Sequence, residues 1–166
     1  LLKTVSKSLN DAMLNLNDVV SIQTSIEITT EPLNLSLFIS KTLDVLHDQI
    51  VLKSAIIRNE VSEEIVVNYN PAYLESILLN FIFNAIRYSH PDRIPEIHLY
   101  TSIIEGQVVL HISDNGIGID LDKYGDQLFG MHKTFHSHPD SKGVGLFISK
   151  NQIDSMGGKV KVHSKV

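Results

Sequence analysis

The chain has 166 residues, of which 43% are hydrophobic, enough for one packed domain with an appendage rather than a disordered chain. Its formal net charge is −5 and it has no long basic run, so nucleic acid is not the expected partner. It has no cysteine, which excludes disulfides and thiolate metal sites, and no apolar run approaches the roughly 20 residues of a membrane span, so we expect no membrane contact.

Residues 1–30 are predicted to form a long helix, because they lack glycine and proline and repeat apolar residues at spacings of three and four. The repeat runs from Leu2 to Ile26 with one polar interruption at Gln23. This seam fits a helix that pairs with another helix, and it also fits a helix packed on its own domain. We favour pairing, because the rest of the chain looks self-sufficient. Pro32 marks the helix end, and since the chain begins without methionine or signal peptide we expect it to be part of a longer protein.

Helix-like and strand-like segments alternate after Pro32. Asn70 and Pro71 are residues that cap and open a helix, and Glu105-Gly106 signals a hairpin turn. The predicted elements are helix 35–52, strands 55–58 and 65–68, a helix from Asn70-Pro71 to Tyr88, strands 94–104 and 107–113 with Val108, Leu110 and Ile112 on one face, helix 144–156 stopped by Gly157-Gly158, and strand 159–166. Helices on one face of a mixed sheet predict an α+β fold, a two-layer sandwich.

A polar stripe crosses the helix that Pro71 opens. Ser76, Asn80, Asn84 and Arg87 follow one another at helical spacing, while most neighbouring positions are Leu, Ile, Phe or Ala. A buried amide is costly unless its hydrogen bonds are satisfied. The amides and the guanidinium of the stripe therefore need a polar partner, and a phosphate chain with its metal ion is a good candidate.

Two glycine-containing segments lie further along the chain. Asp114-Asn115-Gly116-Ile117-Gly118 follows a strand, and the ionised aspartate can accept a hydrogen bond from an exocyclic amine such as that of adenine. The same letters are also ordinary turn sequence. Lys142-Gly143-Val144-Gly145-Leu146 opens the next helix, where free backbone N–H groups attract phosphate; alone, it is equally a flexible loop entering a helix.

Together, in this order and spacing, the three segments resemble the ATP-binding catalytic domain of sensor histidine kinases, within the GHKL superfamily of gyrase, mismatch-repair and chaperone ATPases. Residues 79–89 resemble the family's N box, 114–118 its first glycine box and 143–146 its second. Leu128-Phe129-Gly130-Met131 with Thr134-Phe135 is similar to its phenylalanine box. The resemblance implies the Bergerat-type ATP-binding fold.

The resemblance also implies roles for individual residues in binding ATP or ADP with Mg²⁺. Asn84 would place its side-chain oxygen on Mg²⁺, Asn80 would lie beside the metal and phosphates, and Arg87 would meet a phosphate where the family usually has lysine. These three form the implied catalytic set. Tyr88 would line the same pocket, and residues 119–142 would form a lid over ATP. The remaining implied contacts are Asp114 with the adenine amine, Gly116 and Gly118 in that wall, and Lys142, Gly143, Val144, Gly145 and Leu146 around the phosphates.

The same resemblance divides the chain and suggests its partners. Residues 1–30 look like the C-terminal helix of a dimerisation and phosphoacceptor domain, and 31–166 like the catalytic domain. The implied partners are the acceptor histidine domain of the same protein, in a homodimer through the N-terminal helix, and a response regulator. The implied location is the cytoplasm, although the full-length protein can be membrane-anchored.

One residue distinguishes the branches of the superfamily. Hydrolysing members usually have glutamate where this chain has Asn80, and an amide is no general base at neutral pH. Asn80 thus favours phosphoryl transfer to a protein over ATP hydrolysis. The alternatives are an ATP hydrolase of the superfamily and a protein-interaction module without catalysis, which intact Asn84, Asp114 and Gly143 argue against.

The chain departs from the family at two places and carries no acceptor motif. Ser141 stands where a further glycine is common, and the family's last strand is missing beyond Val166. None of the eight histidines has the acceptor context, so we expect the acceptor to precede Leu1. His132, His136 and His138 with Asp140 offer a metal site as an alternative to an ordinary polar lid.

Overall fold

Two long strands joined by a tight turn form most of the main sheet in the computed structural model, which describes residues 28–130 and 144–166. Strands β4 (Glu96–Ile104) and β5 (Gln107–Asp114) pair antiparallel. Glu105 and Gly106 between them both have positive φ, 52° and 77°, as a two-residue hairpin turn requires. β2 (Ile56–Asn59) pairs parallel with β4, which gives the mixed order β2-β4-β5. The predicted hairpin is confirmed.

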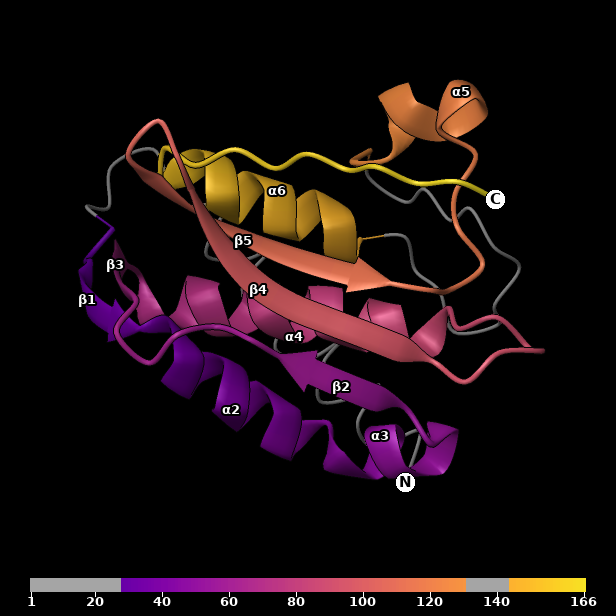
Figure 1. Cartoon of the computed structure of the whole chain (residues 1–166). Coiled ribbons are helices and arrows are strands. Elements are labelled where there is room, and N and C mark those ends of the chain that lie inside the picture. The colour runs from indigo at the N-terminus through magenta and orange to yellow at the C-terminus, as the bar shows by residue number, and fades with distance from the viewer. Residues whose placement is uncertain (1–27, 131–143) are drawn as a thin grey trace.

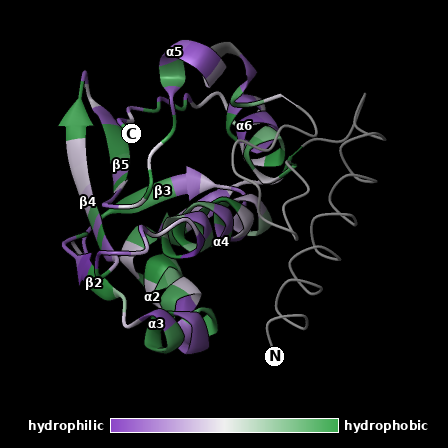
Figure 2. Cartoon of the chain, turned by 90° about the vertical axis from the view of Figure 1, so that its right-hand side faces the viewer, coloured by the Kyte–Doolittle hydropathy of each residue, from purple (hydrophilic) through white to green (hydrophobic). Residues whose placement is uncertain are grey.

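Three helices cover one face of this sheet (Figures 1 and 2). They are α2 (Leu35–Val45), α4 (Pro71–Arg87) and α6 (Gly145–Ser155), with α4 in contact with both others and with β4 and β5. The side chain of Asn70 accepts a hydrogen bond from the N–H of Tyr73 at 3.1 Å, so the predicted cap is confirmed. The predicted α+β two-layer sandwich is confirmed as well.

The core lies between the helices and the sheet, with α4 at its centre. Leu78 and Ile82 of α4 are fully buried, and they belong to the same cluster as Ile97 and Leu99 of β4. In β5, Leu110 and Ile112 pack against this cluster, whereas Val108, at the hairpin end, is 39% exposed. Alternate residues of β4 and β5 thus face the helices, as the period of a strand predicts.

The segment predicted as helix 35–52 is two helices. α2 ends at Val45 and α3 (His47–Lys53) begins after Leu46, whose side chain is fully buried. No glycine or proline marks this break in the sequence. The packing of Leu46 against the core overrides a helical pattern that is locally continuous.

A second, small sheet was not predicted. β1 (Glu31–Asn34) pairs antiparallel with β3 (Val66–Tyr69), and its Asn34 side chain caps α2 by accepting from the N–H of Leu37 at 2.8 Å. Residues 28–30 are not helical, so the helix predicted for 1–30 does not extend through them. The rest of that helix lies outside the described residues.

The final segment is not a strand, contrary to the prediction for 159–166. α6 ends at Ser155, and beyond Gly157 and Gly158 the chain runs back across the molecule without pairing in a ladder (Figure 1). It is held near the loop after β5 by a hydrogen bond from the N–H of Ile119 to the hydroxyl of Ser164, at 2.8 Å. Between these segments lie a short helix, α5 (Leu121–Tyr124), and a 3₁₀ turn, η1 (Gly125–Gln127).

Candidate nucleotide-binding site

The polar stripe of α4 faces helix α6 over part of its length. The Nδ2 of Asn80 donates to the hydroxyl of Ser149 in α6 at 2.8 Å, and the Nδ2 of Asn84 donates to the Oδ1 of Asn80 at 3.2 Å. Asn80 is 3% exposed and Ser149 is 1% exposed. The polar partner of Asn80 is therefore protein, and its amide is used at both ends in the contact between α4 and α6.

The next turn of the stripe is more open. Asn84 and Arg87 are half-buried, and within the described residues no hydrogen bond reaches the Oδ1 of Asn84. The guanidinium carbon of Arg87 lies 5.9 Å from the ring centre of Phe83 and 5.6 Å from that of Tyr88. Stacking of this kind holds a guanidinium in place while it keeps its charge. The last turn of α4 thus presents an amide oxygen and a cation.

The loop after β5 packs directly on this end of α4. The N–H of Ile117 donates to the carbonyl of Tyr88 at 3.0 Å. A Cβ on Gly116 would lie 2.5 Å from the same carbonyl oxygen, so only glycine fits there. Asp114 is exposed at the end of β5, and its Oδ1 accepts from the N–H of Gly116 at 2.8 Å.

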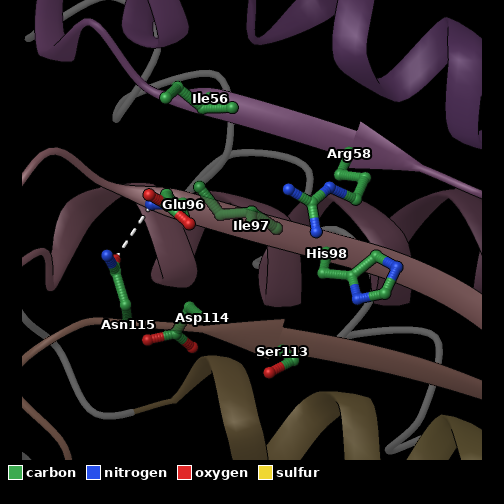
Figure 3. Close-up of a pocket in the computed structure, with 8 residues that line it drawn as sticks. All are labelled: Ile56, Arg58, Glu96, Ile97, His98, Ser113, Asp114 and Asn115. Carbon is green, nitrogen blue, oxygen red and sulfur yellow. Dashed lines mark hydrogen bonds between the residues drawn. The ribbon is translucent and has the colours of Figure 1, made fainter.

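Asp114 lies on the helix side of the sheet, opposite Ile97 in the ladder. Asn115 fixes the loop by accepting from the N–H of Glu96 at 2.9 Å (Figure 3) and by donating to the carbonyl of Ile94, also at 2.9 Å. The structure therefore brings together Asp114 and the last turn of α4, which come from separate sequence motifs.

Gly118, in the same loop, lies against the C-terminal segment. Its φ is +71°, and a Cβ there would lie 2.0 Å from the carbonyl oxygen of Lys165. Glycine is needed at this position because the C-terminal segment crosses the loop at close range.

The second glycine box is described only from its middle onward. Val144 precedes α6, Gly145 is its first residue, and Leu146 follows half-buried. Helices α4 and α6 run in opposite directions (Figure 1), so the start of α6 lies toward the end of α4 that carries Asn84. Lys142 and Gly143 lie outside the described residues, as do the candidate metal ligands His132, His136, His138 and Asp140.

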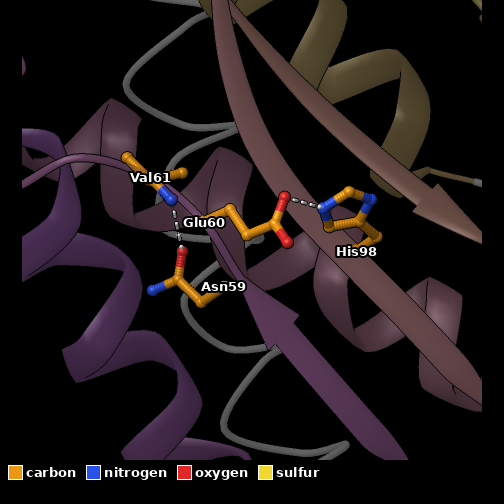
Figure 4. A network of polar contacts seen from close by, with 4 residues as sticks. All are labelled: Asn59, Glu60, Val61 and His98. Atoms are coloured by element: carbon orange, nitrogen blue, oxygen red, sulfur yellow. Dashed lines mark hydrogen bonds and ion pairs between the residues drawn. The ribbon is translucent and has the colours of Figure 1, made fainter.

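A shallow pocket on the other face of the sheet extends to the end of β5, where Asp114 and Asn115 belong to its lining. Arg58, His98 and Ser113 line it from three neighbouring strands (Figure 3). His98 pairs with Glu60 at 2.7 Å (Figure 4). The ring of Tyr100 is stacked on that of His111 and is tilted by 32° relative to that of His98. Glu60 and Tyr100 thus hold the His98 ring in place at the edge of this pocket.

Sequence reasoning missed Ser149, which lies four residues beyond Gly145 in a segment predicted only as a helix. Its signal was weak, since one serine on a helix is common. Among the described residues no group of three or more His, Asp or Glu side chains could hold a metal ion. The described helices also include none that is long and apolar enough to cross a membrane.

Comparison with known proteins identifies what the chain is similar to. The family described as "Histidine kinase-, DNA gyrase B-, and HSP90-like ATPase" matches residues 69–166. The sensor protein kinase WalK of Staphylococcus haemolyticus is 27% identical over 97% of the chain, which spans only 28% of that relative's length.

Solved structures share the fold. The catalytic domain of histidine kinase ThkA has a TM-score of 0.67 at 20% identity, over 79% of this chain and 86% of that one. Full-length ShkA in complex with AMPPNP has a TM-score of 0.71 at 23% identity, over 90% of this chain and 31% of that one. These findings confirm the resemblance drawn from the N box and the two glycine boxes.

Proposed function

This chain belongs to the family of histidine kinase-, DNA gyrase B- and HSP90-like ATPases, and we propose that it binds ATP with Mg²⁺ and transfers the γ-phosphoryl group to a histidine. The relatives named as sensor kinases support the kinase branch of the family. In the transfer, the imidazole nitrogen of the acceptor attacks the γ-phosphorus, the bond to the β–γ bridging oxygen breaks, and ADP leaves.

The observation that carries this proposal is the buried amide of residue 80. Hydrolysis needs a base that activates water, and Asn80 supplies none, because an amide does not take up a proton at neutral pH. Both ends of its amide are also engaged, with Ser149 and with Asn84. Phosphoryl transfer to a ready nucleophile needs mainly positioning and charge neutralisation, which such a site can provide.

The residues at the end of α4 suit Mg²⁺ and phosphates. Mg²⁺ prefers oxygen ligands and keeps several waters, so a single amide oxygen with the ATP phosphates is a sufficient protein contribution. The Oδ1 of Asn84 is an acceptor without a hydrogen bond from the described residues, which fits this role. Bound Mg²⁺ would neutralise phosphate charge. Asn80 orients Asn84 by accepting its Nδ2 hydrogen bond. Arg87 and Tyr88 would contact the phosphates.

The loop after β5 would recognise the adenine ring. Asp114 holds Gly116 through one carboxylate oxygen, and within the described residues no hydrogen bond reaches the other, so it can accept from the adenine amine. Because Gly116 and Gly118 have no side chain, this loop can pass close to the backbone of Tyr88 and of Lys165. The start of α6 lies beside the phosphates, with Val144, Gly145 and Leu146 following Lys142 and Gly143.

The acceptor and the partners follow from the same proposal. Residues 1–30 belong to a dimerisation and phosphoacceptor domain, in a homodimer, and 31–166 form the catalytic domain. The phosphoryl group passes from the acceptor histidine to an aspartate of a response regulator, in the cytoplasm where ATP is available.

Calorimetry with AMPPNP, in Mg²⁺ and in EDTA, tests the binding site. We expect binding that Mg²⁺ strengthens, and we expect Asn84→Ala to remove most of the strengthening while binding in EDTA stays. Asn68→Ala, at an exposed position of β3, is the matched control. An equal loss in both conditions would make Asn84 a structural residue only.

Radiolabelled ATP tests the transfer. With a separate phosphoacceptor domain we expect acid-labile label on that domain and none on this chain. Label on this chain would show that one of its eight histidines is an acceptor. Rapid release of free phosphate without label would favour a hydrolase.

A further inference from the structure

The orientation of the Asn84 amide depends on a chain of three side chains. Asn84 donates from Nδ2 to the Oδ1 of Asn80, and Asn80 donates from Nδ2 to the hydroxyl oxygen of Ser149. We call this series the Asn84–Asn80–Ser149 chain. It crosses from α4 to α6, and in both hydrogen bonds the donor is on the Asn84 side and the acceptor is on the Ser149 side.

The direction of these hydrogen bonds matters for metal binding. A side-chain amide has one acceptor end and one donor end. While the Nδ2 of Asn84 is held by Asn80, its Oδ1 is the end that remains for a cation. If the Asn84 amide turned over, it would present N–H groups, which cannot ligate Mg²⁺.

Bulk solvent has little access to the last member of the chain. Asn80 and Ser149 are 3% and 1% exposed. Without the serine hydroxyl, the buried Nδ2 of Asn80 would lose its acceptor, and a buried donor without a partner is unfavourable. Asn80 would then turn its amide toward another acceptor, and the nearest amide oxygen in the chain is that of Asn84.

We infer that Ser149 is a positioning residue, which acts through Asn80 to keep the Oδ1 of Asn84 directed at Mg²⁺. The inference rests on the proposed function, because it presumes that Asn84 binds the metal. It also gives α6 a second role. The helix begins beside the phosphates at Gly145 and, one turn later, sets the geometry of the metal ligand. Groups behind a metal ligand commonly tune metal binding in this way.

The test measures the dissociation constant of AMPPNP in Mg²⁺ and in EDTA for the whole chain. We define the magnesium gain as the EDTA value divided by the Mg²⁺ value. Ser149→Ala should lower the magnesium gain about tenfold and leave binding in EDTA unchanged. Ser155→Ala is the matched control on the same helix, since its hydroxyl donates only to the carbonyl of Gln152, at 2.9 Å. It should leave the magnesium gain unchanged.

A double variant separates positioning from packing. If Ser149 acts through Asn84, then Ser149→Ala should have no further effect on the magnesium gain once Asn84→Ala is present. Ser149→Cys, which preserves the side-chain size with a weaker acceptor, makes the same test if the alanine variant does not fold.

The outcomes distinguish the two proposals. A normal magnesium gain in Ser149→Ala, with a gain in the unaltered chain that depends on Asn84, would overturn the positioning role and leave the proposed function intact. Equal weakening in Mg²⁺ and EDTA would also overturn it. An unaltered chain whose AMPPNP binding does not respond to Mg²⁺ would overturn the metal site and the positioning role together.

Discussion

Replacing Gln152 with methionine should stabilise the fold. Gln152 lies one turn beyond Ser149 on α6 and is 1% exposed. Neither its Nε2 nor its Oε1 has a hydrogen-bond partner among the described residues. A buried polar group without a partner costs about 1–3 kcal/mol. Methionine is also unbranched, adapts to irregular space and has a similar helix propensity, so it removes the polar atoms with little change in shape.

The expected gain in the free energy of unfolding is therefore about 1–3 kcal/mol. For a chain of this size, each kcal/mol raises the melting temperature by roughly 2–4 °C. Urea denaturation followed by circular dichroism measures the gain. Gln107→Met is the matched control, because Gln107 is exposed at the start of β5 and its replacement should change stability by less than about 0.5 kcal/mol.

The opposite result would refute the reasoning. If Gln152→Met lowers stability by more than about 1 kcal/mol, the amide is hydrogen bonded in solution, with a buried water as the simplest partner. The magnesium gain serves as a second readout. It should not change, because Gln152 makes no hydrogen bond to the Asn84–Asn80–Ser149 chain.

Three further predictions concern the nucleotide loop and the pH response. Asp114→Asn should weaken AMPPNP binding roughly ten- to a hundredfold, because a hydrogen bond to a charged group contributes about 1.5–3 kcal/mol; calorimetry giving an unchanged affinity would remove Asp114 from the site. Gly118→Ala should destabilise the fold in urea more than Gly157→Ala. Both glycines have positive φ, but only at Gly118 would the new Cβ meet a backbone atom, the carbonyl oxygen of Lys165. Equal losses would show that the terminal segment moves aside. Burial raises the pKa of Tyr69 from 10.0 to about 12. Between these pH values the unfolded chain loses a proton that the folded chain keeps, so stability falls as pH rises. The urea midpoint of Tyr69→Phe should fall less from pH 9 to pH 11; an identical fall in both proteins would contradict this.

Local sequence determined the elements whose causes lie within a few residues. Asn70 and Pro71 start α4, and Glu105-Gly106 turns β4 into β5, because caps and two-residue turns depend on neighbouring backbone groups. The order of the three boxes along the chain was sufficient for the family. The polar stripe was visible too, since helical spacing alone puts Asn80 and Asn84 on one line.

Tertiary structure decided which partners these side chains have. Asn80 binds Ser149, 69 residues away, and no local pattern relates the two. The break at Leu46 and the pairing of β1 with β3 likewise depend on packing between distant segments. Segment 159–166 has the alternation of a strand but no ladder, because a strand exists only where a neighbouring edge pairs with it. The stripe thus predicted polar surroundings for these side chains. The antiparallel packing of α6 on α4 determined that the partner of Asn80 is a protein side chain, and that the Oδ1 of Asn84 is left as the acceptor for a ligand.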